Sequence, residues 1–308
     1  MDSVYTTTIT TAAKKRDIQV NVLDPYQPIF ELIYRNKSVR CYNALTDNIG
    51  AATFHLAQNK FAANYFLKQH GFPVADQTMY TNMESALRFL SDHHCIVVKP
   101  SAQWGGRGVS THITCRVELE EALEFAREYC DEIVLEKCVT GIDWRLIFVN
   151  FKYVCAIERN PASITGNGIA SIRELILEKN RFTRDTDPGN CIPLDKETLR
   201  TINSMGLDFN SVPGHNEYIQ VRRTTNYHTG GTVDIVTDRI PSEYISVCEK
   251  AVKLLNIPVL GVDILADTTS NSFHIIELSP DLAISPPEGD IVVEAWLDYL
   301  FPDSIVNI

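Results

Sequence analysis

Two carboxylates near the C-terminal end of the sequence are spaced to act together. Asp263 lies in the apolar run VLGVDIL and Glu277 in FHIIEL, with a polar loop, 267–272, between the runs. Pairing the runs as antiparallel strands places the two acids opposite each other to within about one residue, with Cβ atoms ~5 Å apart. Carboxylates so close repel each other unless a cation lies between them, and hard oxygen ligands suit Mg²⁺ bridging nucleotide phosphates. The alternative is that one or both acids are surface residues of an edge strand.

A glycine-rich segment follows a lysine in the first half of the chain. Lys99 ends a short apolar strand, and three glycines, Gly105, Gly106 and Gly108, follow within a few residues. Glycine lets backbone N–H groups approach an anion closely, so the segment suits a polyphosphate. It matches neither a Walker A loop nor Gly-x-Gly-x-x-Gly spacing. A plain hairpin turn between two strands explains it equally well.

The run RRTTNYHTGG, which starts at Arg222, is the third candidate. A guanidinium beside glycine amides can stabilise the charge of a transferring phosphoryl group. The alternative is a solvent-facing strand on which the two arginines alternate.

Composition excludes several classes of protein. The 308 residues contain 28 Lys plus Arg and 39 Asp plus Glu, which gives a formal net charge of −11 and argues against nucleic-acid binding. No apolar run approaches the ~20 residues that span a bilayer, and the N-terminus does not look like a secretory signal, so we expect a cytoplasmic protein without a membrane partner. The eight Cys include no Cys-x-x-Cys pair, which excludes the common zinc and redox motifs.

Hydrophobic periodicity predicts the elements that position these residues. We expect helices over 4–16, from an N-cap at Asn59, around 119–130 and from about 242. Strands are expected at 18–24, 96–98, 133–135, 144–149, 153–158, 259–266 and 273–278, with a hairpin between 149 and 153. Strands are expected to dominate the centre of the chain. The pattern is typical of an α+β fold with antiparallel sheets.

With these residues in place, the chain from about Gln58 to Pro302 resembles the ATP-grasp module of cyanophycin synthetase and, more distantly, that of bifunctional glutathione synthetases. Many ordered runs carry the resemblance over most of the chain. They are NK opening a helix before GFPV, VVKP with the glycine segment, VLEKCVTGIDWR, ERNPASITGNG, IRELI, the run from Arg222 to Gly231, GVD, IE and the closing LFP.

The resemblance implies an ATP-grasp fold, in which two α+β lobes clasp ATP after a small N-terminal α/β lobe. The implied domains are the N-terminal lobe over 1–57, the first lobe with the glycine segment and hinge over 58–140, and the second lobe with the metal and acyl-phosphate site over 141–308.

The resemblance also implies a role for each matching residue. Mg²⁺ or Mn²⁺ would be held by Asp263, Glu277 and Ser279. Arg222 and Asn226 would act at the transferring phosphate, and Arg159 would hold a substrate carboxylate. ATP would be bound by Lys60, Lys99, Gly105, Gly106, Gly108, Glu136, Lys137, Val139 and Asp143, the last at the ribose.

The implied activity is that of an ATP-dependent carboxylate–amine ligase that forms an amide through an acyl phosphate and releases ADP and phosphate. Its partners would be small carboxylate and amine substrates, such as amino acids or a short peptide. Catalysis would depend on positioning and on charge neutralisation by metal and arginine, which agrees with the lack of a Ser/His/Asp or Cys/His signature. The sequence leaves a homodimer open.

The sequence departs from the family pattern in three places. Ser279 stands where the metal site commonly has Asn, so Asp281 or water is an alternative ligand. Ser163 and the run LAISPP from Leu282 replace acceptor-side residues of cyanophycin synthetases. The chain also ends at Ile308, so we do not expect the second catalytic module of cyanophycin synthetase, or cyanophycin as the product. Two other functions stay open, a non-catalytic ATP-binding regulator and a ligase that modifies a polypeptide acceptor.

Overall fold

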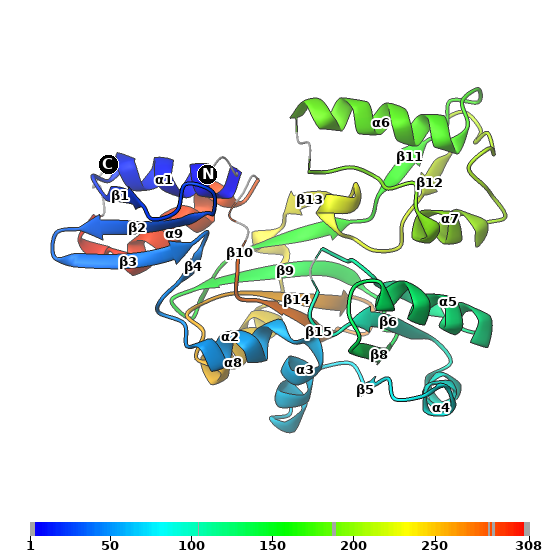
Figure 1. The fold of residues 1–308 in the computed structure, drawn as a ribbon, viewed down its shortest axis with the longest axis horizontal. Helices are drawn as coiled ribbons and strands as arrows, with labels where there is room; N and C mark the ends of the chain where they lie inside the picture. The colour runs from blue at the N-terminus through cyan, green and yellow to red at the C-terminus, as the bar shows by residue number, and fades with distance from the viewer. Residues whose placement is uncertain (1–3, 104, 187–188, 283, 285–286, 305–308) are drawn as a thin grey trace. The chain divides into compact units, whose positions relative to one another are not determined.

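The computed structural model describes residues 4–103, 105–186, 189–282, 284 and 287–304, so Trp104 of the glycine segment and parts of the LAISPP run lie outside the described residues. The chain divides into two compact units (Figure 1). Unit 1 contains the residues up to Ala75, Thr140–Glu158 and those from Asp234 onward, and unit 2 contains Asp76–Val139 and Arg159–Val233. This division follows packing, and the lobe boundaries expected from the resemblance stay a prediction.

Unit 1 begins with a helix and a small antiparallel sheet. Helix α1 (Val4–Lys15) precedes the four-stranded sheet β1-β2-β3-β4 and packs against α9 (Gly289–Leu300) near the other end of the chain. The strands are β1 (Gln19–Val22), β2 (Ile29–Tyr34), β3 (Lys37–Tyr42) and β4 (Leu45–Thr46). The predicted N-terminal helix and the first strand are therefore confirmed.

A five-stranded sheet, in the order β13-β10-β9-β14-β15, is the centre of unit 1 (Figure 1). Its strands are β9 (Ile142–Val149), β10 (Lys152–Asn160), β13 (Thr232–Ile235), β14 (Val259–Asp267) and β15 (Ser272–Ser279). The helices of this part are α2 (Ala51–Gln58), α3 (Lys60–Gln69), α8 (Ser242–Leu255) and the short η2 (Thr237–Arg239) and η3 (Pro302–Ser304). Asn150 and Phe151 both have positive φ, as a two-residue hairpin turn requires, which confirms the predicted hairpin.

Alternation along the strands divides this sheet into two faces. Trp144, Leu146 and Phe148 of β9 face a core that α2, α3 and α8 complete. Ile147 and Val149 point the other way, into a second core with α1 and α9. Asp143 and Arg145 lie on that second face at the opposite end of β9, where the sheet carries polar rather than apolar side chains.

Unit 2 contains a four-stranded antiparallel sheet and a small helical part. The sheet has the order β5-β8-β6-β7, and α4 and α5 cover one of its faces with an apolar core. Its elements are β5 (Gln77–Met79), α4 (Met83–His93), β6 (Ile96–Pro100), β7 (Ser110–Ile113), α5 (Arg116–Arg127) and β8 (Ile133–Lys137).

The helical part of unit 2 contains two helices that were not predicted, while the strands expected in the centre of the chain are confirmed as β8, β9 and β10. Two helices, α6 (Ile172–Thr186) and α7 (Lys196–Asn203), pack on a two-stranded sheet of β11 (Ser163–Thr165) and β12 (Tyr218–Gln220), which the turn η1 (Tyr227–Thr229) follows. The buried Ile172, Leu175 and Ile176 of α6 recur at helical spacing, so the sequence contains a local signal for this helix. Among the described residues, no helix is long and apolar enough to span a membrane.

Candidate functional site

The two carboxylates singled out in the sequence lie side by side in unit 1. Strands β14 and β15 pair antiparallel, and Asp263 is directly opposite Glu277. The ladder shifts by one residue next to Asp263, so Ile276 is an extra residue that opposes no residue of β14. Without this bulge, Glu277 would lie opposite Val262 and point into the apolar core. The bulge therefore returns Glu277 and Ser279 to the polar face of the sheet.

Asp263 is held by an arginine that the sequence did not assign to the site. Its side chain is 0% exposed, and Arg145, its register partner on β9, donates from Nε to Oδ1 over 2.6 Å and from Nη2 to Oδ2 over 2.9 Å. Arg145 Nη2 also donates to Ser279 Oγ over 3.1 Å. A bidentate bond of this kind satisfies both carboxylate oxygens of a buried acid.

Gly261 makes room for this arrangement. It lies opposite Ser279 and two residues before Asp263, so it shares their face of the sheet. A Cβ atom at position 261 would lie 3.3 Å from Ser279 Cβ, 3.5 Å from Arg145 Cδ and only 2.9 Å from Leu282 Cδ2. The absent side chain thus leaves the space in which the arginine crosses the strand to reach Ser279.

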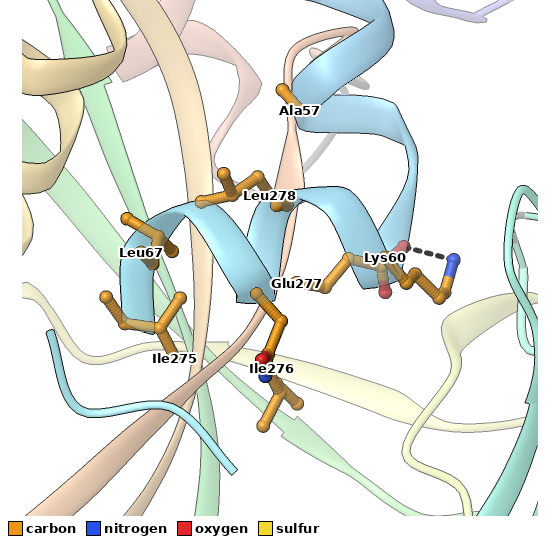
Figure 2. A pocket seen from close by; sticks show the side chains of 9 residues that line it. Ala57, Lys60, Leu67, Ile275, Ile276, Glu277 and Leu278 are labelled. Atoms are coloured by element: carbon orange, nitrogen blue, oxygen red, sulfur yellow. Dashed lines mark ion pairs between the residues drawn. The ribbon is translucent and has the colours of Figure 1, made fainter. Parts of the chain in front are cut away.

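Glu277 forms the second ion pair of the site. Lys60, the first residue of α3, places Nζ 3.0 Å from Glu277 Oε1, and the dashed line in Figure 2 marks this pair beside a small pocket. Lys60 is directed by the helix start, because Asn59 caps α3 by accepting a hydrogen bond from the Ala62 N–H. The cap predicted at Asn59 is confirmed. Glu277 is 34% exposed, so one carboxylate of the pair can reach a ligand.

The oxygens of this polar face fit a hard divalent cation that brings other ligands with it. Glu277 is partly exposed and Ser279 offers a hydroxyl, whereas Asp263 is buried and would have to share with the metal the oxygens that now accept from Arg145. Mg²⁺ is commonly held in proteins by one or two carboxylates together with phosphate oxygens and water. Within the described ranges, no group of three or more His, Cys, Asp and Glu side chains is placed to bind a metal ion. A cation here would therefore depend on oxygen ligands from a bound substrate. Asp281, the alternative ligand, is exposed just beyond β15.

The polar face of the sheet in unit 2 holds another buried ion pair. Lys99 Nζ on β6 lies 2.7 Å from Glu136 Oε2 on β8, and both side chains are almost fully buried. Gln77, opposite Glu136 on β5, donates from Nε2 to the same oxygen. These side chains lie on the face opposite the apolar core, because Ile96, Val98 and Leu135 fill the other face.

The glycine segment joins β6 and β7, so its interpretation as a hairpin connection is confirmed. Gly105, Gly106 and Gly108 all have φ near +70°, a conformation that favours glycine. A Cβ at Gly106 would lie 3.6 Å from Asn226 Cβ, so the segment lies against the turn that follows Arg222.

Arg222 is buried, and its Nη1 donates to Asp195 Oδ1 over 2.8 Å and to Thr198 Oγ1 over 2.9 Å. The arginines follow the end of β12 and Arg222 is buried, so the alternative of a solvent-facing strand is wrong. Arg223 is less buried than Arg222. Burial, together with the charges of Arg223 and Arg200, lowers the pKa of His112 on β7. Asn226 accepts from the His228 N–H and caps the turn η1.

A scan against models of protein families finds no match. The chain is 30% identical over 293 residues to cyanophycin synthetase of Trichormus variabilis, which covers 89% of this chain and 32% of that protein. It is also 30% identical over 292 residues to the glutathione biosynthesis bifunctional protein of Clostridium perfringens, with 88% and 37% covered. The chain thus spans about a third of the length of these relatives.

Solved structures decide the fold. A bifunctional glutathione synthetase from Pasteurella multocida superposes with a TM-score of 0.64 at 21% identity, over 97% of this chain and 43% of that one. A D-alanine–D-alanine ligase from Bacillus anthracis superposes with a TM-score of 0.53 at 14% identity, over 82% and 70%. The chain has the ATP-grasp fold. The α+β class and the resemblance expected from the sequence are confirmed.

The other predicted site residues of this ATP-grasp chain lie on strands or directly after them. Asp143 is buried on β9, two residues before Arg145 and on the same face. Lys137 ends β8 and is exposed, and Val139 follows it. Arg159 lies near the end of β10 and is partly buried. The roles of these residues stay predictions.

Several side chains that contact the predicted site residues were not themselves predicted to belong to the site. They are Gln77 beside Glu136, Arg145 beside Asp263 and Asp195 beside Arg222. The position of Arg145 two residues after Asp143 on an expected strand was a usable signal, because it places both side chains on one face. Gln77 and Asp195 gave no such signal, since the contacts that they make join separate elements.

Proposed function

We propose that this chain is an ATP-dependent carboxylate–amine ligase that uses ATP and Mg²⁺ and releases ADP and phosphate. The observation that carries the proposal is the facing pair of Asp263 and Glu277 beside Arg145 and Lys60, on a fold shared with a glutathione synthetase and a D-alanine–D-alanine ligase. The names of the similar proteins describe amide-bond synthesis from amino acids or peptides, so the proposed substrates are a small carboxylic acid and an amine of that class.

The proposed reaction has two steps whose atoms balance. A carboxylate oxygen of the first substrate attacks the γ-phosphorus of ATP, the bond to the bridging oxygen breaks, and ADP leaves. The amine of the second substrate then attacks the acyl carbon, the carbon–oxygen bond to phosphate breaks, and the amine loses a proton. No protein nucleophile is needed, so the contribution of the chain is orientation and charge neutralisation.

The residues of unit 1 fit the phosphate end of this reaction. Glu277 and Asp263 would hold Mg²⁺, with Ser279 or Asp281 beside them, and the metal would neutralise charge on the transferring phosphoryl group. Lys60 lies within reach of the same carboxylate, so its ammonium would bind a phosphate oxygen once Glu277 turns to the metal. Arg145 holds both carboxylate oxygens of Asp263 in place.

The residues of unit 2 fit the nucleotide. Lys99 and Glu136 would contact ATP from the polar face of their sheet, and the backbone of 136–139 would lie along the adenine. The N–H groups between Gly105 and Gly108 would cover the phosphates. Arg159 would bind the substrate carboxylate. Since Arg222 is bound to Asp195 and Thr198, its contact with a phosphate would require it to exchange these partners.

The test is product formation from Mg²⁺, ATP and amino acids taken in pairs. We expect ADP together with a condensed product whose mass equals the two substrates minus water. Asp263→Asn and Glu277→Gln should each reduce the rate by at least about 100-fold, because each weakens the charge on which the metal depends. Asp267→Asn is the matched control, since it changes a carboxylate on the same hairpin but in the exposed turn.

Other outcomes separate the alternatives. Full activity of either site variant would remove the metal assignment, and AMP with pyrophosphate would exclude the acyl phosphate. ATP binding without turnover on any pair would favour a regulator, whereas ADP formed only with a protein acceptor, together with a mass shift on that protein, would identify polypeptide modification. Arg159→Ala should chiefly raise the KM for the carboxylate substrate.

A further inference from the structure

Two cysteines of unit 2 that no part of the proposed reaction uses lie directly across from each other. In the pairing of β6 with β8, Ile96 is opposite Lys137, so the next position brings Cys95 opposite Cys138. The pairing continues to that position, because the Cys138 N–H donates to the Cys95 carbonyl oxygen over 3.0 Å. Their side chains lie on one face of the sheet and are in hydrogen-bond contact with each other.

Directly opposed residues in such a strand pair lie at a Cα–Cα distance that suits a disulfide. Opposed residues of a hydrogen-bonded antiparallel pair have Cα atoms about 5.5 Å apart, within the range of about 4.4–6.8 Å that disulfides span. Both thiols are unoxidised in the structure and only partly buried, so a small reagent can reach them.

The position of the pair ties it to the proposed nucleotide site. Alternation places Cys95, Val97 and Lys99 on one face of β6, and Glu136 and Cys138 share that face of β8. The thiols thus lie on the same face as the buried Lys99–Glu136 ion pair. Cys138 also belongs to the segment 136–139, which we place along the adenine.

We propose that Cys95 and Cys138 form a reversible disulfide by exchange with a low-molecular-weight disulfide, and that this bond weakens ATP binding. The disulfide itself does not depend on the proposed function, whereas its effect on ATP rests on it. The effect follows because a cross-link at Cys138 fixes the start of a loop that must adapt to the base.

The exchange balances in two steps. The Cys95 thiolate attacks one sulfur of the disulfide RSSR, forms a mixed disulfide and releases one thiolate. The Cys138 thiolate then attacks the Cys95 sulfur and releases the second, so two protein thiols lose two protons and two electrons while RSSR becomes two RSH. Burial and the hydrogen bond with Cys95 raise the pKa of the Cys138 thiol to about 12, which favours Cys95 as the first nucleophile.

The first experiment uses the full chain with oxidised and reduced glutathione at varied ratios. After free thiols are alkylated and the protein is digested, mass spectrometry should find the peptides of Cys95 and Cys138 linked, and dithiothreitol should separate them. In Cys138→Ser, Cys95 should instead retain bound glutathione. Cys115→Ser, which removes an exposed cysteine of the same unit, should leave the link unchanged.

The second experiment compares the Kd for MgATP of the reduced and oxidised chain. We expect oxidation to weaken MgATP binding about tenfold. Linkage then requires saturating MgATP to raise by the same factor the concentration of oxidised glutathione, divided by the square of the concentration of reduced glutathione, at which half of the protein is oxidised. The Cys95→Ser variant should bind MgATP like the reduced chain under both conditions.

Three results would overturn the proposal or part of it. Alkylation of both cysteines at every glutathione ratio excludes the disulfide, whatever the nucleotide does. A linked pair with unchanged MgATP affinity excludes the coupling. Failure of the reduced chain to bind MgATP removes the proposed function and the coupling together, while the peptide map still decides the disulfide by itself.

Discussion

At the residue scale, the Arg145–Asp263 pair is the structural basis of the proposed metal site. Removing one partner of a buried ion pair leaves an uncompensated charge in a poorly solvated position, which typically costs about 3–5 kcal/mol. The pair also determines where the Asp263 oxygens point, so its stability and its geometry depend on the same two hydrogen bonds.

We expect Arg145→Met to lower the free energy of unfolding by about 3 kcal/mol or more in urea, because Asp263 is then buried and loses both bonds. Arg88→Met is the matched control. Arg88 pairs with Glu84 on the surface of α4, where an ion pair contributes less than about 1 kcal/mol. Equal losses from the two substitutions would show that Asp263 does not depend on Arg145.

Glu288, which precedes α9, provides a prediction about pH. It is buried, its Oε2 has no hydrogen-bond partner among the described residues, and burial raises its pKa although the charge of Arg145 opposes the shift. The folded chain therefore binds the proton more tightly than the unfolded chain, so this group stabilises the fold below its ordinary pKa. That stability is lost as the pH rises through the raised pKa.

Glu288→Gln should consequently stabilise the chain more at pH 7 than at pH 4, because the amide stays neutral. Urea unfolding of the wild type and the variant across this range measures the difference. Glu243→Gln, at an exposed acid in the first turn of α8, should show no such pH-dependent gain. A gain that is independent of pH would contradict the assigned titration.

At the scale of elements, the hairpin of β14 and β15 and the connection between β6 and β7 show how local backbone conformation places chemistry. In the first, one extra residue turns Glu277 from the apolar face to the polar face. In the connection between β6 and β7, three residues have positive φ values, a backbone conformation that glycine adopts without strain. Packing around the three glycines differs, although their backbone conformations are alike.

Alanine substitutions should separate strain from packing in that connection. Gly105→Ala meets no atom within 4 Å, so we expect only the backbone cost of about 1–2 kcal/mol. Gly108→Ala should cost clearly more, because its Cβ would lie 2.8 Å from Pro100 Cγ and 2.9 Å from Tyr129 Cδ2. Equilibrium unfolding of both variants tests this order, and equal losses would refute the packing argument.

At the scale of the whole molecule, the proposed function requires a chain of net charge −11 to bind an anion, and the cations proposed for this role lie beside carboxylates. Lys60 and Lys99 are both buried in ion pairs, each in a different unit. Such cations are held in fixed positions, so in the proposed function they would attract phosphates without a large reorganisation of their own side chains.

If the proposed function is correct, MgATP should stabilise the folded chain by mass action, by about 2.7 kcal/mol at a concentration 100 times its Kd. A rise in the thermal unfolding temperature measures this gain. Lys60→Met and Lys99→Met should each reduce the rise, whereas Lys152→Met, at an exposed position of β10, should not. An equal rise in all four proteins would show that neither buried lysine binds the nucleotide.

The sequence by itself predicted the strands β1, β6, β8, β9, β10, β14 and β15, the helices α1, α3, α5 and α8, the cap at Asn59 and the approach of Asp263 to Glu277 within about one residue, because periodicity, capping and hairpin register are local properties of the chain. The remaining strands and helices were not predicted. The ordered motifs of the sequence also identified the fold. Only the tertiary structure decided that Arg145 holds Asp263, that Gln77 and Lys99 meet at Glu136, that Arg222 is bound to Asp195 and that Cys95 faces Cys138. These contacts join residues that are distant in the sequence. Strand order, a bulge and packing decide which side chains meet, and no local sequence pattern contains that information.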